Sequence, residues 1–172
     1  MLPTDMRTPF IHCRVAGVED SEGLAQLKLA GEDRWTQSKF ENELSVLSSR
    51  GWVAVGGQDV KGYLLLRCAG ESWDVVRVGV ERESRRQGIG RMLLRTACVA
   101  IDRAGGQEVF LEVREGNGAG IALYRSVGFQ RCGHRSNYYE DNGEDALVMR
   151  LDLSVGPVIG GKTPGKRHGN ID

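Results

Sequence analysis

The sequence predicts an α/β domain built on one mixed sheet with helices on both faces. Three observations lead to this expectation. Short apolar runs alternate or cluster as strands do, other segments repeat apolar residues at helical spacing, and the segments follow one another in the order β-α-α-β-β-β-α-β-α-β-β. Three successive strands favour antiparallel pairing early in the sheet, and the strand-helix-strand unit that follows favours parallel pairing around the central helix.

One strand and two helices open the chain. Ile11, Cys13 and Val15 alternate with polar neighbours, as in a strand with one face on a core. Each helix is indicated by a capping residue followed by apolar residues at helical spacing. These residues are Asp20, Ser21, Leu24 and Leu27 for the first helix, and Ser38, Phe40, Leu44 and Leu47 for the second, which is expected to end at Gly51.

Three β-rich runs and a long helix occupy the middle of the chain. The runs are Trp52 to Val55, Val60 to Arg67 and Trp73 to Val80, and the glycine-rich link between the first two has the composition of a hairpin turn. A basic loop with two glycines then leads into the most strongly amphipathic helix, Ile89 to Arg103, which is expected to end at Gly105.

The last third of the chain predicts a strand, a short helix and two more strands. Val109 to Val113 is apolar on both faces, as expected for a strand that is covered on both sides. The short helix carries Tyr124 and stops at Gly128, and the final strands lie near Gln130 to Arg135 and Asp145 to Leu153.

Length and charge limit the class of protein. The 172 residues suffice for one core, so we expect one domain over residues 1–153 and a disordered, glycine- and proline-rich tail over 154–172. The 23 basic and 23 acidic side chains balance, which argues against nucleic acid or a membrane as the main partner. No apolar stretch approaches the roughly 20 residues that span a bilayer, and no secretory segment is apparent, so a cytoplasmic location is expected.

The cysteines and histidines do not predict a metal site. None has the short paired spacing of structural zinc ligands, so no metal is expected. Each cysteine lies in an apolar or strand-like run, which favours buried free thiols over a Cys-His catalytic pair. The residues are Cys13, Cys68, Cys98 and Cys132, with His12, His134 and His168.

Residues 156–163 match the triphosphate-binding pattern G-x-x-x-x-G-K-[ST]. That loop works only when a helix follows the Lys-Thr pair directly, so that backbone N–H groups and the helix dipole meet the phosphates. Pro164 and Gly165 follow instead, and the chain ends seven residues later. We therefore do not expect this segment to bind a nucleotide.

A second glycine-containing loop stands where an anion site requires it, after a predicted strand and at the start of the central helix. Gly88 and Gly90 lack the Cβ atoms that would keep a ligand from the backbone, so a pyrophosphate fits there. The alternative is a basic turn that only caps the helix. The loop comprises Arg85, Arg86, Gln87, Gly88, Ile89, Gly90 and Arg91.

This loop resembles motif A, [RQ]-x-x-G-x-[GA], of the GCN5-related N-acetyltransferases, and later segments resemble the ribosomal-protein-alanine branch of that family. The likeness extends over about residues 14–153 and keeps the family's order. The later segments are Leu111 to Asn117, Ala122 to Tyr124, Gly128 and Phe129, Asn137 to Tyr139, and Glu144 to Ala146.

The resemblance implies a partly splayed mixed sheet, with acetyl-CoA lying between the strand before motif A and the strand after its helix. It places the pantetheine and acetyl group beside Val78, Gly79 and Val80, and the pyrophosphate on Arg85 to Arg91. Asn117 is implied as a further cofactor contact.

The resemblance implies Glu112 as proton acceptor and Tyr124 as proton donor. The chemistry needs both roles, because an ammonium does not attack a thioester and the leaving thiolate takes up a proton. The alternatives are that Glu112 pairs with Arg114 or Arg95 at a strand end, and that Tyr124 packs on Phe129.

For the acceptor side, the resemblance implies a groove between Trp35 and the two tyrosines Tyr138 and Tyr139, for an extended N-terminal peptide. The alternative is that these aromatics only cover the core. The chain departs from the family pattern where proline, serine or a bulkier residue is usual, and the departures are Arg34, Gly79, Gly116, Gly118 and Gly120.

The expected function is transfer of an acetyl group from acetyl-CoA to the N-terminal α-amine of a protein, with a ribosomal protein as the expected partner. Acetyl-CoA serves as co-substrate, and no metal, nucleic acid or membrane takes part. One alternative keeps the reaction and changes the acceptor to a small amine or an internal lysine. Another is a non-catalytic acyl-CoA-binding module.

Overall fold

The computed structural model describes residues 10–29 and 34–155. In these ranges a seven-stranded sheet carries four α-helices and two single-turn 3₁₀ helices, Val18–Asp20 and Arg82–Ser84. The elements are β1 (Ile11–Val15), α1 (Ser21–Gln26), α2 (Gln37–Ser45), β2 (Ser49–Gly56), β3 (Asp59–Ala69), β4 (Ser72–Val80), α3 (Ile89–Arg103), β5 (Glu108–Arg114), α4 (Gly118–Val127), β6 (Gln130–Arg135) and β7 (Ala146–Asp152).

The observed element order confirms the predicted one. The strands are arranged β1-β2-β3-β4-β5-β7-β6, and β4 with β5 is the parallel pair while the other neighbours pair antiparallel. Long helix α3 connects the two parallel strands, because parallel neighbours need a crossover. The predicted mixed sheet is therefore correct.

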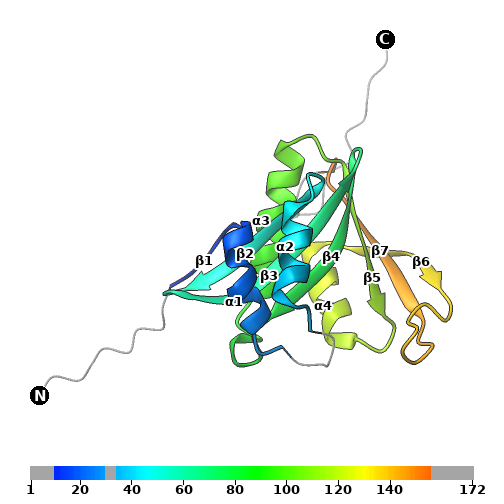
Figure 1. Cartoon of the computed structure of the whole chain (residues 1–172). Helices are drawn as coiled ribbons and strands as arrows, with labels where there is room; N and C mark the ends of the chain where they lie inside the picture. Colours follow the sequence, from blue (N-terminus) through cyan, green and yellow to red (C-terminus); the bar gives the residue numbers. More distant parts are fainter. Residues whose placement is uncertain (1–9, 30–33, 156–172) are drawn as a thin grey trace, which may run out of the picture.

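Helices cover both faces of the sheet, which Figure 1 shows as α1 and α2 on one side and α3 and α4 on the other. The core under α3 and α4 includes Leu93, Leu111 and Met149, and the smaller core under α1 and α2 includes Phe40 and Tyr63. None of the helices in the described ranges is long and apolar enough to cross a membrane.

The sheet opens between β4 and β5. The two strands pair only from Ser72 and Glu108 to Asp74 and Phe110. Beyond these positions β4 continues to Val80 and β5 to Arg114 without pairing to each other. The splay that the family resemblance implied is present, and it leaves a gap between two strand edges in the middle of the sheet.

Strand β5 departs from its predicted pattern. Val109, Leu111 and Val113 are buried under α3 and α4, whereas Glu108 and Glu112 on the other face are half-buried. The smaller core under α1 and α2 includes residues of β2 and β3 and reaches Val76 of β4, but no β5 residue. The expectation that helices cover β5 on both faces is therefore wrong.

Three expectations about α2 are also wrong. Thr36 caps the helix by accepting a hydrogen bond from the Lys39 N–H at 3.3 Å, in place of Ser38. Leu47 lies beyond the helix end and is 93% exposed. Gly51 does not end the helix but lies inside β2, where a Cβ would come within 2.8 Å of Leu44 Cδ2. Glycine at this position lets α2 pack closely on the sheet.

The thiols differ in burial. Cys98 is buried, Cys13 and Cys68 are half-buried, and Cys132 is exposed, so the expectation of four buried thiols is wrong for Cys132. Cys132 lies on β6, which is an edge strand of the sheet and has β7 as its only partner among the described strands. Of the predicted tail, residues 154–172, only residues 154 and 155 are described. The triphosphate-like segment, residues 156–163, lies outside the described residues, and the domain boundary stays a prediction.

Gly79 is required by packing, and this gives a stability prediction. A Cβ at residue 79 would lie 2.6 Å from Cε1 of Tyr63, whose side chain is fully buried. We expect Gly79→Ala to lower the free energy of unfolding by about 1–3 kcal/mol, because the buried ring has to shift. Gly118→Ala is the matched control, since a Cβ there meets nothing within 4 Å. Urea denaturation measures both, and equal stability of the two variants would contradict the assignment.

Candidate active site

The loop before α3 presents backbone donors. Gly88 is the N-cap residue with φ 81°, and Arg86 also has a positive φ of 61°. No side chain caps the helix, and the first helical bond runs from Met92 N–H to the Gly88 carbonyl at 2.9 Å. The N–H groups of residues 88–91 therefore have no acceptor within the helix. Backbone donors at a helix N-terminus suit an anion such as a diphosphate.

Gly90 has a role that the sequence did not indicate. It is buried, and a Cβ at this position would lie 3.0 Å from Cδ2 of Leu123 in α4. The missing side chain therefore lets α4 pack against the first turn of α3. At Gly88 a Cβ would meet nothing within 4 Å, so that glycine is explained by its positive φ alone.

The residues expected beside the pantetheine lie on the unpaired part of β4. Val78 and Val80 pack against the core under α3 and α4, and Gly79 lies against Tyr63. These positions pair with β3 but lie beyond the last pairing with β5. The gap between the strands thus borders the residues that were predicted to line it.

Tyr124 reaches this region from α4. Its ring packs edge-on against Phe129 with centroids 5.9 Å apart, and 7% of the residue is exposed. Burial, together with the nearby Tyr139, raises the pKa of Tyr124 to about 12. Its hydroxyl has no hydrogen-bond partner among the described residues. The Tyr124 ring thus packs on Phe129, as the alternative interpretation expected, while the protonated hydroxyl remains available as a hydrogen-bond donor.

Glu112 lies on the face of β5 opposite the main core. Its carboxylate pairs with Arg135 of β6 at 3.2 Å, and 27% of its side chain is exposed. Arg114 and Arg95 were the partners expected for Glu112 if it only formed a strand-end ion pair, and neither is the partner observed. The partial exposure leaves the carboxylate in reach of water.

Asn117 begins α4 and connects it to β5. Its side-chain oxygen accepts a hydrogen bond from the Gly120 N–H at 2.9 Å. A Cβ at Gly120 would come within 2.7 Å of the Asn117 Nδ2 atom, which explains that glycine by packing. The cap therefore accounts for Asn117 in the described structure, and the cofactor contact stays a prediction.

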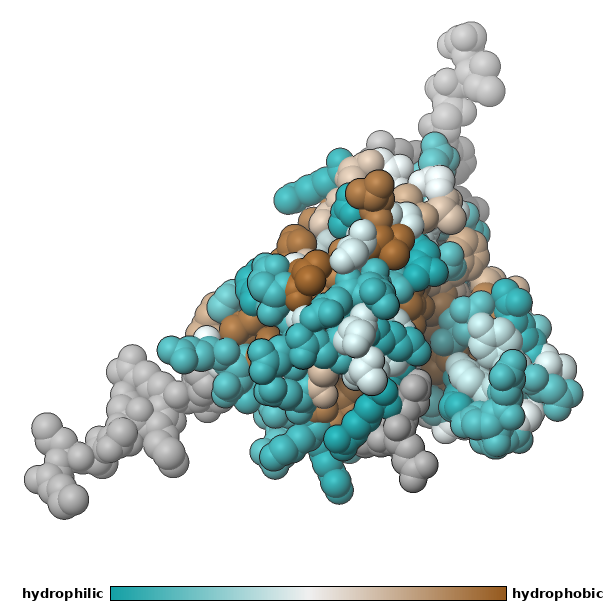
Figure 2. Space-filling model, viewed as in Figure 1, coloured by the Kyte–Doolittle hydropathy of each residue, from teal (hydrophilic) through white to brown (hydrophobic). Residues whose placement is uncertain are grey.

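Aromatic residues lie on two sides of the predicted acceptor region. Trp35 packs on Phe40 with centroids 5.3 Å apart, and the Lys39 ammonium lies 4.6 Å from its ring. Tyr138 and Tyr139, in the loop between β6 and β7, meet edge-to-face at 5.2 Å. Figure 2 shows hydrophobic surface in the furrow between the centre of the molecule and the lobe to its right, where Figure 1 places β6 and β7.

Electrostatics relate three of the predicted residues. Tyr139 is among the groups that raise the pKa of Tyr124. Burial raises the pKa of Tyr139 itself, with a further contribution from Glu112 and an opposing one from Arg114. Tyr139 of the β6–β7 loop is therefore close enough to Tyr124 of α4 and to Glu112 of β5 to interact electrostatically with each.

Two functional partners were missed by reasoning from the sequence. Arg135 pairs with Glu112, and Arg77 on β4 donates to the Tyr63 hydroxyl at 2.8 Å while lying 5.2 Å from the Trp35 ring. The first contact joins β5 to β6, which β7 separates in the sheet, and the second joins β4 to its neighbour β3.

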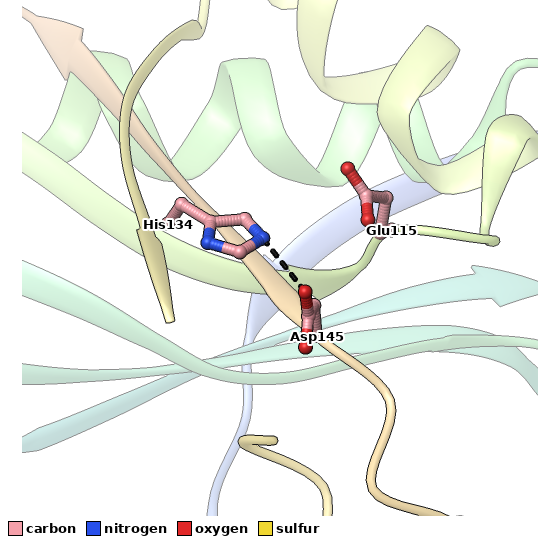
Figure 3. Close-up of side chains that lie close together, drawn as sticks. All are labelled: Glu115, His134 and Asp145. Carbon is pink, nitrogen blue, oxygen red and sulfur yellow. Dashed lines mark ion pairs between the residues drawn. The ribbon is translucent and has the colours of Figure 1, made fainter. Parts of the chain in front are cut away.

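Figure 3 shows a further cluster, in which Glu115, His134 and Asp145 converge from the ends of three neighbouring strands. Their possible ligand atoms lie within 4.8 Å of one another. His134 Nε2 and Asp145 Oδ2 form an ion pair at 3.0 Å, and the second Asp145 oxygen accepts the Asn137 N–H. These contacts account for His134 and Asp145 without an ion, and the absence of a metal stays a prediction.

A splayed sheet with an uncapped helix N-terminus beside the gap defines a class of acyl-CoA-using acetyltransferase, and the comparisons agree. The acetyltransferase (GNAT) domain model matches residues 48–131. N-alpha-acetyltransferase RimI of Mycobacterium tuberculosis is 39% identical over 140 residues, 77% of this chain and 87% of the relative. This chain therefore belongs to the GNAT acetyltransferases.

One further relative agrees on the class, and two solved structures agree on the fold. The [ribosomal protein bS18]-alanine N-acetyltransferase of Escherichia coli is 41% identical over 80 residues, 45% of this chain and 54% of the relative. The crystal structure of the Escherichia coli ribosomal-protein-S18-alanine N-acetyltransferase has a TM-score of 0.75 at 24% identity, covering 89% of this chain and all of that one. An N-acetyltransferase from Thermoplasma acidophilum, in complex with coenzyme A, has a TM-score of 0.70 at 19% identity, covering 84% and 99%.

Proposed function

We propose that this acetyltransferase acts on the N-terminal α-amine of a protein, with a ribosomal protein as the natural acceptor and the cytoplasm as its location. The observation that carries the proposal is the opening between β4 and β5. Helix α3 follows the unpaired end of β4, and Arg114 at the end of β5 contacts the loop that carries Tyr138 and Tyr139. The names of the Mycobacterium tuberculosis and Escherichia coli relatives support the acceptor.

The donor set of this chain fits acetyl-CoA. Backbone N–H groups at residues 88–91 and the cations Arg85 and Arg86 would hold the diphosphate. The unpaired part of β4 would flank the pantetheine arm. When bound, acetyl-CoA supplies a thioester acetyl group that reacts with an amine.

Glu112 and Tyr124 move the protons. A model α-amine has a pKa of about 7.7–8.0 against about 10.4 for lysine, so a carboxylate acting through water can take the α-ammonium proton near neutral pH. Glu112 is exposed enough to reach that water. Tyr124, protonated because its pKa is raised, gives a proton to the leaving sulfur, and the second proton that the nitrogen loses as the amide forms restores the Tyr124 hydroxyl. The amine attacks directly, so no acyl-enzyme forms.

Glu112→Gln tests the base. We expect kcat at pH 7 to fall by about 10- to 100-fold with little change in acetyl-CoA affinity, because the amide takes up no proton. Glu108→Gln is the matched control, since Glu108 lies on the same strand and pairs with Arg150 as Glu112 pairs with Arg135. Steady-state release of coenzyme A measures both. Equal kcat for the two variants would remove Glu112 from the mechanism.

Acceptor choice is tested with peptides. The protein is incubated with isotopically labelled acetyl-CoA and peptides that carry a free N-terminus, a blocked N-terminus or an internal lysine, and mass spectrometry locates the label. The proposal expects label on free N-terminal amines. Label on lysine side chains alone would replace this proposal with acetylation of an internal lysine. Tight acetyl-CoA binding without turnover would favour a binding module.

A further inference from the structure

The loop between β6 and β7 carries both acceptor-wall tyrosines and is folded by its own backbone contacts. The Tyr139 N–H donates to the Glu144 carbonyl at 3.1 Å, and the Asn137 N–H donates to Asp145 Oδ1 at 2.8 Å. Asn137 has a positive φ of 51°. These contacts shape the loop but do not join it to the rest of the active site.

Arg114 makes that connection from β5, two residues after Glu112. Its guanidinium donates to Asp141 at 2.8 Å and to Glu144 and Asn142 at 3.1 Å each. It also lies over the Tyr139 ring, 3.8 Å from the centroid. A planar cation held by carboxylates and stacked on a ring fixes the position of that ring, because each contact restricts the others.

Glu144 extends the connection to the cofactor side. One of its carboxylate oxygens binds Arg114, and the other accepts the Gly116 N–H at 2.9 Å. A Cβ at residue 116 would lie 2.9 Å from that same oxygen. The glycine, which departs from the family pattern, thus makes room for a carboxylate from the opposite loop, immediately before Asn117 begins the helix that carries Tyr124.

We propose that Arg114 and Glu144 form a clamp of positioning residues that holds Tyr139 against the turn before α4 and thereby sets the affinity for the acceptor. The inference rests on the proposed function, because Tyr139 belongs to the proposed acceptor wall. Both clamp residues act through their neighbours rather than on the reacting atoms. Binding of acetyl-CoA at the α3 N-terminus does not depend on them.

Charge supports the clamp at neutral pH. The Gly116 N–H and the Arg114 guanidinium lower the pKa of Glu144, so its carboxylate stays ionised. Partial burial lowers the pKa of Arg114, but its hydrogen bonds and charge interactions with Asp141 and Glu144 outweigh this effect and raise the pKa. The clamp therefore needs no proton transfer to form.

Two substitutions test the clamp by steady-state kinetics. Glu144→Ala and Arg114→Lys are expected to raise the KM for an acceptor peptide by about tenfold, with kcat and the acetyl-CoA Kd within twofold of the wild-type values. Glu144→Gln keeps an oxygen that accepts the Gly116 N–H, so its KM should rise less. An unchanged acceptor KM, or an equal loss of acetyl-CoA affinity, would overturn the proposal.

Matched controls come from the far end of β7, the strand that follows Glu144 in the chain. Asp152 accepts the Ser154 N–H at 2.9 Å and pairs with Arg150, as Glu144 accepts the Gly116 N–H and pairs with Arg114. Asp152→Ala and Arg150→Lys should therefore change stability to a similar extent and leave the acceptor KM unchanged. An equal rise of KM in the controls would show a general effect of stability and contradict the clamp.

A readout without any acceptor separates the clamp from the proposed function. With ring-labelled tyrosine, the NMR signal of Tyr139, assigned through Tyr139→Phe, should shift in Glu144→Ala and Arg114→Lys and stay in place in the two controls. If no peptide is acetylated but this signal shifts, the proposed acceptor is wrong, while the positioning of Tyr139 by Arg114 and Glu144 stands. If peptides are acetylated and the signal does not move, the clamp is wrong.

Discussion

Replacing Tyr124 by phenylalanine is expected to lower kcat at neutral pH by at least about 100-fold, the usual size of the contribution from a positioned proton donor. The change removes one oxygen atom from a buried side chain. Since the Tyr124 pKa is raised to about 12, the hydroxyl is protonated throughout the neutral range and can donate to a thiolate. Release of coenzyme A, followed with a thiol reagent, gives kcat.

The same variant supplies its own structural control. The ring contact with Phe129 does not involve the hydroxyl, and that hydroxyl has no hydrogen-bond partner among the described residues. Thermal unfolding and acetyl-CoA affinity of Tyr124→Phe should therefore match those of the wild type. A kcat equal to that of the wild type would show that another group protonates the sulfur.

Replacing Gly88 by valine is expected to raise the dissociation constant for acetyl-CoA by about 100-fold. The φ of 81° at this position disfavours any β-branched residue, so the loop has to leave the conformation that aims its N–H groups outward. A few charge-assisted hydrogen bonds to phosphate, at about 1.5–3 kcal/mol each, account for a loss of this size. Isothermal titration calorimetry measures the constant.

Gly105 provides the matched control at the opposite end of α3. Its φ is 86°, and a Cβ there meets nothing within 4 Å, as at Gly88. Gly105→Val should therefore cost similar stability without changing acetyl-CoA affinity. If both variants bind acetyl-CoA equally well, strain at a helix end, rather than loss of a binding loop, is the only effect of the substitution.

The long helix and the order of helices and strands along the chain were predictable because their signals are local. Helix α3 runs over Ile89–Arg103 as expected, with one apolar stripe and a glycine at each end. Strand β1 also has the predicted bounds, Ile11–Val15, because alternation of apolar and polar residues is a property of neighbours in sequence. The family resemblance then supplied the splay, which no local pattern of this chain indicates.

The second helix was predicted less well because tertiary contacts decide its face. Leu47 was placed on the inner face, yet it is exposed, and Glu43 is buried instead. The Glu43 carboxylate accepts from Ser49 Oγ at 2.6 Å and pairs with Arg67 of β3. A buried carboxylate is stable only with such partners, and sequence alone does not show that β2 and β3 bring them.

In the predicted site, too, local features could be predicted from the sequence and tertiary contacts could not. The loop at Gly88 could be predicted from its glycines and its place before a helix. The partners of Glu112 and Glu144 could not, because Arg135 and Gly116 reach them only after β7 has inserted between β5 and β6. Local sequence therefore predicts where an anion would bind, and the three-dimensional pairing decides which charged side chains already have a partner.

The grip of the α3 N-terminus on a diphosphate is tested most directly by removing the diphosphate. Calorimetry compares acetyl-CoA with S-acetylpantetheine, which carries the same thioester and pantetheine arm but neither phosphate nor adenosine, and inorganic pyrophosphate serves as competitor. We expect acetyl-CoA to bind at least about 100-fold more tightly than S-acetylpantetheine, with pyrophosphate competing. Equal affinity for the two thioesters, with no competition by pyrophosphate, would contradict the proposed binding of acetyl-CoA.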